Sequence, residues 1–298
     1  MKKSLDKSLK FVFFGTPQLA VYVLEELEKA EYIPSLVVTS PDLKVGRGKY
    51  YDSPPVKKWA EAHKIQVLQP KIIDESFVNL LQEKDYDVFI LTAYGKILPQ
   101  KILSLPEHGI LNIHPSILPR LRGPSPVRSA ILNNERETGT TIIVLDEKMD
   151  HGPIVVQESI KIKDKDWPPL LPTLEEKLFR QGGKLLVKVL KDYIKGKITP
   201  RSQDESKATY CEKIKKTDGL VDLLNDSSKE IYIKYCAYYG WPGIYFMKDP
   251  STGSGQAGKR VKITKARLEN EKLVIEKIIP EGKKEISYKD FNLRYSVD

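Results

Sequence analysis

Asn112 and His114 stand two residues apart in the stretch "LNIHPSILPRLRG", at the end of a short apolar run. On an extended strand, residues two apart point to the same face, so both side chains can act on one atom. A carboxamide supplies a fixed N–H donor, and an imidazole accepts or donates a proton near neutral pH. The pair therefore suits a carbonyl that becomes tetrahedral, with Asn112 at the oxyanion and His114 handling protons. The alternative is a histidine that only caps the end of its strand.

Asp150 is the candidate for a third member of this site. It follows the strand-like run "GTTIIVLDE" and precedes a Gly-Pro turn. If that strand lies beside the one that ends at His114, Asp150 reaches the same edge of the sheet, where a carboxylate would hold the tautomer of the imidazole and favour its charged form. Two alternatives stay open, a purely turn-forming Asp150 or Asp146 in its place. His151 is adjacent but should point away.

The elements that must position these side chains follow an alternating pattern. Up to about residue 200, short apolar runs alternate with amphipathic segments, which predicts a βαβα order and a Rossmann-like, mostly parallel sheet. The run from Val88 to Leu91 is apolar throughout, as expected of a strand buried on both faces. A long helix is predicted from Thr173 to about Gly196, with Thr173 and Glu176 as a capping box.

Beyond residue 207 the composition shifts toward Lys and Tyr, with several short strand-like runs and one helix around "SSKEIYIKYCAYYG". This pattern predicts a small C-terminal β-barrel of the OB-like kind. The predicted organisation is a catalytic domain at 1–197, a linker at 198–207 and an OB-like domain at 208–298. The start "FVFFGTPQLA" has only Gly15 where a dinucleotide fingerprint needs three glycines, so a structural turn is the better interpretation.

Composition excludes some classes of protein and favours others. The chain has 298 residues, 40% hydrophobic and 30% charged, as in ordinary folded domains, and its two cysteines lie in no metal-binding or disulfide pattern. This use of cysteine predicts a protein of the reducing cytosol, so we expect a cytoplasmic protein. No apolar run approaches the length of a membrane span. The net charge of +9 suits a polyanionic partner, although a lysine-rich solubility surface would give the same value.

A long basic loop is predicted between the second strand and its helix, from Pro41 to Ala60. Its lysines and arginine exceed its acids by three, and Gly46 and Gly48 favour mobility. Long loops at the carboxyl ends of strands often carry function, but a merely flexible, solvated loop has the same composition.

Taken together, "NIHPSILPRLRG" and "LDEKMDHGPI" resemble the pattern of the folate-dependent formyltransferases, in which an Asn-x-His on a strand and a downstream Asp form the catalytic trio. Further matching stretches in the first two-thirds of the chain are "FFGTPQLAV", "VTSPDLKVGRGKYYDSPPVK", "LTAYGKILP" and "ETGTTIIVLDEKMDHGPI". The tail matches more loosely, through "TYCEKIKKTDGLVD" and "YYGWPG".

The resemblance implies roles for particular residues. Asn112, His114 and Asp150 would be catalytic. The turn after His114 would line the folate site and the segment "TAYGKIL" would border the pterin pocket, which makes the candidates Ser116, Ile117, Leu118, Pro119, Tyr94, Gly95 and Ile97. The "GRGK" loop would reach the acceptor end of a tRNA. Its candidates are Lys44, Arg47 and Lys49, with Arg47 the best single one.

The implied reaction transfers the formyl group of 10-formyltetrahydrofolate to the α-amine of methionine on initiator tRNA, for translation initiation. Folate is then a co-substrate, no metal is required, and the OB-like domain lies along the tRNA. The nearest rival is an amino-sugar nucleotide formyltransferase, which would have little use for a basic loop. A phosphoribosyl glycinamide formyltransferase needs only the first domain, and a non-catalytic RNA-binding protein would leave the trio without purpose. We expect a monomer, although the sequence does not distinguish one from a dimer.

Overall fold

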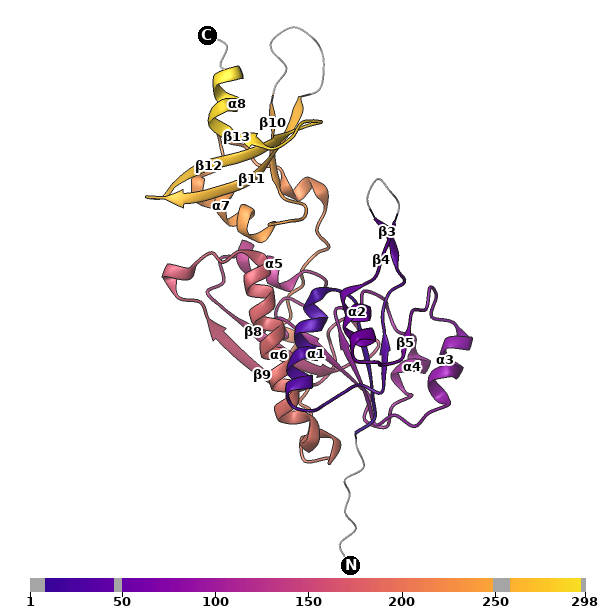
Figure 1. The fold of residues 1–298 in the computed structure, drawn as a ribbon. Coiled ribbons are helices and arrows are strands. Elements are labelled where there is room, and N and C mark those ends of the chain that lie inside the picture. The colour runs from indigo at the N-terminus through magenta and orange to yellow at the C-terminus, as the bar shows by residue number, and fades with distance from the viewer. Residues whose placement is uncertain (1–8, 46–49, 249–257, 296–298) are drawn as a thin grey trace, which may run out of the picture. The chain divides into compact units, whose positions relative to one another are not determined.

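A computed structural model describes residues 9–45, 50–248 and 258–295 of the chain (Figure 1). The chain forms two compact units that are not consecutive in sequence. The first unit comprises Met1–Gly123, Glu137–Ile160 and Glu175–Tyr210. The second comprises Pro124–Arg136, Lys161–Leu174 and Cys211–Asp298. Because the chain passes between the units several times, the domain limits expected at 197 and 208 stay a prediction.

A seven-stranded sheet forms the centre of the first unit, in the order β5-β2-β1-β6-β7-β8-β9. The strands are β1 (Phe11–Gly15), β2 (Leu36–Val38), β5 (Val67–Leu68), β6 (Val88–Thr92), β7 (Ile110–His114), β8 (Glu137–Val144) and β9 (Ile154–Lys161). The pairings from β5 through β7 are parallel, whereas β7 and β8 are antiparallel. The predicted mostly parallel α/β sheet is confirmed.

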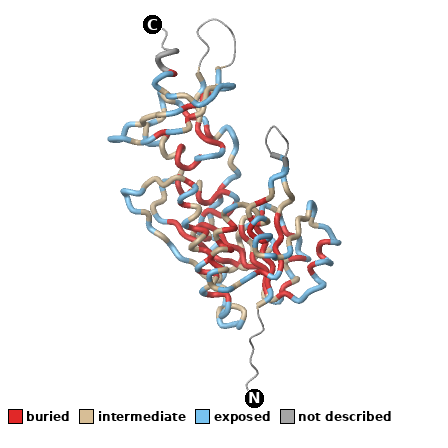
Figure 2. Tube along the Cα trace, viewed as in Figure 1, coloured by how far each residue is buried: buried red, intermediate tan, exposed pale blue. Residues whose placement is uncertain are grey.

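Helices cover both faces of this sheet (Figure 1). They are α1 (Gln18–Lys29), α2 (Pro55–Ala62), α3 (Glu75–Gln82), α4 (Gln100–Leu103) and α6 (Leu171–Ile194). Alternate residues of β1 enter two separate cores: Phe13 packs with residues of α1, α2 and α6, whereas Phe14 packs with residues of α3 and α4. Burial on both faces explains why the central strands carry uninterrupted apolar runs, and the buried residues of this unit concentrate around the sheet (Figure 2).

The start of α6 corrects one prediction. The helix begins at Leu171, and the N–H groups of Thr173 and Leu174 both donate to the carbonyl of Leu170. Thr173 therefore lies inside the first turn and cannot cap it, because a capping residue precedes the helix.

The second unit contains an antiparallel sheet in the order β10-β11-β12-β13, as expected of a β-rich C-terminal part. Its strands are β10 (Ile244–Lys248), β11 (Lys259–Glu269), β12 (Lys272–Pro280) and β13 (Ile286–Ser287). Its helices are α5 (Pro126–Leu132), α7 (Ser228–Ala237) and α8 (Tyr288–Tyr295). At the start of α7, Ser227 and Glu230 form a reciprocal capping box, so the predicted helix is confirmed. Among the described residues, every helix is too short or too polar to cross a membrane.

Candidate active site

The structure brings the side chains of His114 and Asp150 together. The Nδ1 atom of His114 lies 3.5 Å from an Oδ1 oxygen of Asp150. His114 and Asn112 are both buried, with 4% and 7% of their surfaces exposed. They lie on β7 two residues apart, as predicted, so they share one face of the strand.

The hydrogen bond of the second ring nitrogen of His114 determines which nitrogen faces Asp150. Nε2 lies 3.0 Å from the carbonyl oxygen of Leu121, which can only accept a hydrogen bond, so Nε2 carries a proton and donates it. Nδ1 is then the nitrogen left to face Asp150 and to exchange a proton.

Asp150 reaches His114 by a different route from the one expected. Because β8 runs antiparallel to β7, Thr141 is opposite His114 and Val144 is opposite Leu111, so β8 ends beside the beginning of β7. The loop between β8 and β9 must therefore return Asp150 to the histidine. Asp150 adopts a left-handed backbone conformation with φ of 50°, and its Oδ2 atom accepts a 2.7 Å hydrogen bond from the Gly123 N–H.

Asp146, the alternative to Asp150, is engaged elsewhere. Its carboxylate accepts a hydrogen bond from the backbone N–H of Lys148 at 3.0 Å and lies 2.5 Å from Nδ1 of His151. Nε2 of His151 lies 3.5 Å from a carboxylate oxygen of Glu205. The structure thus pairs Asp150 with His114 and pairs Asp146 with His151.

The turn that follows His114 is held by hydrogen bonds to its backbone. The hydroxyl of Thr141 donates to the carbonyl of Ser116 at 2.6 Å and accepts from the N–H of Leu118 at 3.2 Å. The side-chain amide of Gln157 donates to Thr141 and to the carbonyl of Leu118, both at 2.8 Å. Ser116 and Leu118 are buried, whereas Ile117 and Pro119 are half-buried and keep surface free for a ligand.

The segment Thr92–Leu98 divides between core and surface. Tyr94 is 2% exposed and packs edge-on against Phe14 with ring centroids 5.5 Å apart, so its ring belongs to the core. Gly95 has a φ of 79°, which favours glycine, and Ile97 is 90% exposed. Of these three candidates, Ile97 is the one whose side chain offers free surface.

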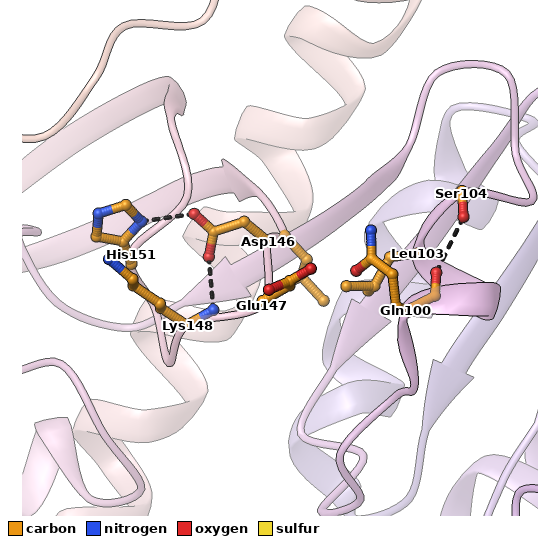
Figure 3. Close-up of a pocket in the computed structure, with 8 residues that line it drawn as sticks. Gln100, Leu103, Ser104, Asp146, Glu147, Lys148 and His151 are labelled. Atoms are coloured by element: carbon orange, nitrogen blue, oxygen red, sulfur yellow. Dashed lines mark hydrogen bonds and ion pairs between the residues drawn. The ribbon is translucent and has the colours of Figure 1, made fainter.

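A cavity of about 410 Å³ lies between α4 and the loop after β8 and was not expected from the sequence (Figure 3). One wall is α4 and its end, and the other is the loop that carries Asp150. The residues that line it are Gln100, Leu103, Ser104, Leu145, Asp146, Glu147, Lys148 and His151. The signal for it in the sequence is the pair of acids directly after the β8 strand, at the same loop that supplies Asp150. Apolar and acidic side chains together suit a ligand with a flat, partly apolar body and N–H donors.

The predicted basic loop contains a hairpin in its described part. β3 (Leu43–Val45) and β4 (Tyr50–Asp52) pair antiparallel and project from the body of the first unit (Figure 1). Lys44 is exposed and its ammonium lies 5.3 Å from the centre of the Tyr51 ring. Arg47 and Lys49 lie outside the described residues.

Two lysines of α2, at the end of the predicted basic loop, form ion pairs with acids of the same loop. The ammonium of Lys57 lies 2.8 Å from Asp42, and that of Lys58 lies 2.6 Å from Asp52. Asp42 also accepts a 2.7 Å hydrogen bond from Gln69, and these bonds hold its pKa below the ordinary value of 3.8. The positive charge of these two lysines is therefore offset by acids of the same loop.

Comparison with known proteins defines the class first. The Formyl transferase model matches residues 9–190, and the model of the Formyl transferase C-terminal domain matches residues 213–273. The methionyl-tRNA formyltransferase of Thermodesulfovibrio yellowstonii is 37% identical over 303 residues, which cover 94% of each chain. That of Chloroflexus aurantiacus is 44% identical over 242 residues, covering 80% of this chain and 76% of the relative. The chain belongs to the methionyl-tRNA formyltransferase family.

Solved structures show the same fold at lower identity. The methionyl-tRNA formyltransferase from Clostridium thermocellum superposes with a TM-score of 0.58 at 15% identity, covering 91% of this chain and 98% of that one. The N-formyltransferase from Helicobacter canadensis, in complex with folinic acid and dTDP-3-aminofucose, gives 0.64 at 20% identity, covering 94% and 98%. These likenesses extend the shared fold to both units of the chain.

Proposed function

We propose that this protein transfers the formyl group of 10-formyltetrahydrofolate to the α-amine of methionine on initiator tRNA, as a cytoplasmic monomer. The observation that carries the proposal is the approach of Asp150 to within 3.5 Å of His114, next to Asn112 on one strand of a formyl transferase fold. Relatives of similar length named methionyl-tRNA formyltransferase support the choice of acceptor.

The chemistry asks the protein chiefly for positioning. An α-amino group titrates near pH 8, so a useful fraction is already neutral and nucleophilic near pH 7. The nitrogen attacks the formyl carbon, the carbonyl oxygen gains negative charge, and the bond from carbon to N10 of the folate then breaks. One proton must leave the attacking nitrogen and one must reach N10.

The three side chains divide these tasks. The amide of Asn112 and the protonated ring of His114 stabilise the oxyanion, and Asp150 helps to remove the proton of the attacking amine. Because Nε2 of His114 is engaged with the Leu121 carbonyl, Nδ1 is the atom through which the ring acts. Asp150 lies beside that atom, so one carboxylate both stabilises the imidazolium and accepts a proton.

The cavity between α4 and the loop that carries Asp150 suits the pterin end of folate. Its acids, Asp146 and Glu147, can accept hydrogen bonds from the N–H groups of a pterin ring, and Leu103 and Leu145 can flank its faces. Ser116, Ile117, Leu118, Pro119, Tyr94, Gly95 and Ile97 would complete the folate site, chiefly through their backbone and through the free surface of Ile97. HypX from Aquifex aeolicus, which shares the fold, was crystallised in complex with tetrahydrofolic acid, and this supports folate as the donor.

The hairpin β3–β4 is proposed to contact the acceptor end of the tRNA through Lys44, Arg47 and Lys49. The C-terminal unit would contact the same tRNA, and its strand β11 contributes Lys259, Arg260 and Lys262. Contacts to several phosphates release counterions, so binding of the tRNA should weaken steeply between low and moderate salt. A sugar nucleotide would show a shallow dependence.

An acceptor panel tests the proposal directly. Labelled 10-formyltetrahydrofolate is offered with methionyl-tRNA or with a set of amino-sugar nucleotides, the acceptor class named for the Helicobacter canadensis neighbour. We expect label on methionyl-tRNA alone, and label on the sugars alone would refute the assignment. Asn112→Ala and His114→Ala should each lower the rate by about 10²-fold or more, whereas Asn79→Ala on the exposed face of α3 serves as a control.

A further inference from the structure

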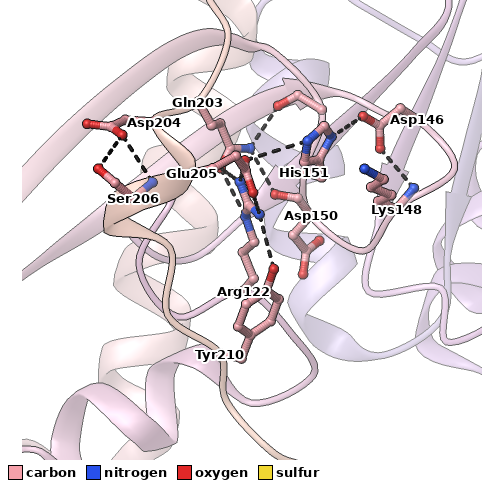
Figure 4. Close-up of polar contacts among 11 residues, drawn as sticks. Arg122, Asp146, Lys148, Asp150, His151, Gln203, Asp204, Glu205, Ser206 and Tyr210 are labelled. Carbon is pink, nitrogen blue, oxygen red and sulfur yellow. Dashed lines mark hydrogen bonds and ion pairs between the residues drawn. The ribbon is translucent and has the colours of Figure 1, made fainter.

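Arg122 is a buried arginine that lies outside the trio. It is 1% exposed, and it extends from the end of the turn that follows His114. Its guanidinium forms five hydrogen bonds, to the side chains of Gln203, Glu205 and Tyr210 (Figure 4). A guanidinium has five N–H donors, so every donor of Arg122 is used.

Gln203 connects this arginine to the loop of Asp150. Its carbonyl oxygen accepts from Nε and Nη2 of Arg122, at 3.2 and 2.8 Å. Its amide nitrogen donates to the backbone carbonyls of Asp150 and Gly152, both at 2.8 Å (Figure 4). The amide can therefore lie in only one orientation, because exchanging its oxygen and nitrogen would face donors with donors and acceptors with acceptors.

Glu205 completes the anchor. It binds Arg122 through both carboxylate oxygens, at 2.6 and 3.0 Å, which is the bidentate geometry that fixes direction as well as distance. Its hydrogen bond to Arg122 lowers the pKa of Glu205 from the ordinary value of 4.5 and keeps the carboxylate charged.

The segment that supplies Gln203 and Glu205 is fixed at both of its ends. Arg201 exchanges two backbone hydrogen bonds with Ile154, at 2.7 and 2.9 Å. At the other end, the backbone of Thr209 bonds to Pro119 and Arg122, and its hydroxyl accepts from the Leu121 N–H at 2.9 Å. The same segment therefore contacts the turn whose Leu121 carbonyl holds His114 and the loop that carries Asp150.

We propose that Gln203, oriented by the Arg122–Glu205 ion pair, is a positioning residue that holds the carboxylate of Asp150 against His114. The inference rests on the proposed catalytic role of Asp150. The left-handed backbone at Asp150 is one that non-glycine residues seldom adopt, so it persists where neighbouring contacts enforce it. Gln203 supplies two such contacts on either side of His151, and the Gly123 N–H fixes the carboxylate itself.

The cost of burying Arg122 agrees with a positioning role. The side chain of Arg122 is 1% exposed whereas that of Glu205 is 56% exposed, so the loss of hydration falls on the guanidinium. An ion pair that costs hydration in this way is seldom more stabilising than apolar residues of the same size. Its advantage is geometric, since a satisfied polar network admits one arrangement. Here that arrangement directs the two N–H donors of the Gln203 amide to backbone carbonyls of the loop that carries Asp150.

The test is a double-mutant cycle between Gln203 and Asp150. Gln203→Met removes the donors and the acceptor at similar length, and Gln203→Glu keeps an acceptor for Arg122 while removing the donors to both carbonyls. Each should lower kcat for formyl transfer by about 10- to 100-fold, as expected when a reacting group is displaced by about 1 Å, with KM values for both substrates within twofold of wild type. In an Asp150→Asn background, measured by single turnover with excess enzyme, the same substitutions should change the rate less than about threefold.

Glu176→Gln is the matched control. Glu176 accepts a 2.8 Å hydrogen bond from Arg180 in an ion-pair network on α6, and it takes no part in the site. This variant should keep wild-type kcat in the wild-type background and the single-turnover rate of Asp150→Asn alone in the other.

Equal losses of kcat in both backgrounds would show that Gln203 does not act through Asp150 and would overturn the inference. Unchanged kcat, or a rise of KM with unchanged kcat, would overturn it as well. The double-mutant cycle measures formyl transfer to whichever acceptor the acceptor panel has identified. Label on sugars alone therefore refutes the proposed acceptor, whereas an additive cycle refutes only the role of Gln203.

Discussion

Replacing Thr141 with valine should loosen the turn that we assign to the folate site. Thr141 lies on β8 opposite His114 and is fully buried. Its hydroxyl donates to the Ser116 carbonyl and accepts from the Leu118 N–H and from Gln157. Valine has nearly the same shape, so the substitution removes these three bonds without leaving a cavity.

The adjacent Thr140 is a matched comparison on the opposite face of the same strand. It is equally buried, and its single hydroxyl proton is shared between the carbonyl of Leu178, at 2.9 Å, and the side-chain oxygen of Gln181, at 3.2 Å. Leu178 lies within α6, so its carbonyl keeps a helical partner when the hydroxyl is removed. Thr140→Val therefore loses a hydrogen bond but leaves the Leu178 carbonyl paired.

The magnitudes differ accordingly. Thr141→Val leaves the Ser116 carbonyl and the Leu118 N–H buried without this partner, and at about 1 to 3 kcal/mol each the free energy of unfolding should fall by about 2 to 6 kcal/mol. Thr140→Val should lower it by about 0.5 to 1.5 kcal/mol, the net value of one hydrogen bond. Only Thr141→Val disturbs the turn, so only that variant should raise KM for 10-formyltetrahydrofolate, by about tenfold for each 1.4 kcal/mol of binding free energy lost.

Equilibrium urea unfolding measures the first difference and steady-state kinetics with varied folate measures the second. If Thr141→Val shows the expected loss of stability but keeps the wild-type KM, the binding of 10-formyltetrahydrofolate does not depend on this turn. An equal rise of KM in Thr140→Val would show that the effect comes from general destabilisation of β8.

Three further predictions concern the active-site loop, a buried thiol and the ion pair of Arg122. Gly152→Ala should lower kcat by about tenfold or more in steady-state assays. The reason is that a Cβ at this position would meet the Val144 carbonyl oxygen at 1.8 Å, so the loop that carries Asp150 would have to shift. A wild-type kcat would show that the loop tolerates this displacement. Burial raises the pKa of Cys236 to about 12, so iodoacetamide at neutral pH should label it only in urea, as located by mass spectrometry, and rapid labelling of the native chain would contradict this. Because the pKa of Glu205 is lowered in the folded state, its pair with Arg122 stabilises the protein above the ordinary pKa of 4.5 and ceases to do so as pH falls through the lowered value. Urea midpoints should therefore separate wild type from Glu205→Gln at pH 7 and converge in acid, and a separation that grows in acid would refute the pairing.

Local patterns predicted most of the first unit because its central strands are buried on both faces. The uninterrupted apolar runs of β1 and β6, separated by amphipathic helices, have few structural solutions other than a parallel sheet. The direction of β8 could not be predicted from a local sequence pattern in the same way. β8 is buried over six of its eight residues, as its parallel neighbours are, and strand direction depends on what connects two strands.

The connection between β7 and β8 explains this failure. It contains the turn after His114 and the short helix α5, which belongs to the second unit. Among the described residues, neither of the two cores that flank the sheet includes a residue of α5. A parallel neighbour requires a crossover that packs on the sheet. Without one, β8 returns antiparallel, and Asp150 must come back to His114 through its loop.

The side chains of the site show the same limit of prediction from local sequence patterns. Asn112 and His114 are two apart on one strand, so the period of the strand is enough to place them together. Gln203 lies 81 residues from Arg122, in the polar stretch "RSQDES" that has the composition of a linker. The hydrogen bonds that give this stretch its role join residues far apart in sequence, and no local period encodes them.

The nature of the reaction explains why positioning groups would matter here. The amine is nucleophilic without activation and the formyl carbon is already electrophilic, so most of the rate enhancement must come from placing charges where the oxyanion and the departing proton develop. A carboxylate on an unsupported loop would sample many positions, and only some of them lie within reach of Nδ1 of His114. Fixing that loop by a buried guanidinium and a single side-chain amide restricts it to one position. For this reason substitutions at Arg122 and Gln203 should act on kcat, although neither residue would touch a substrate.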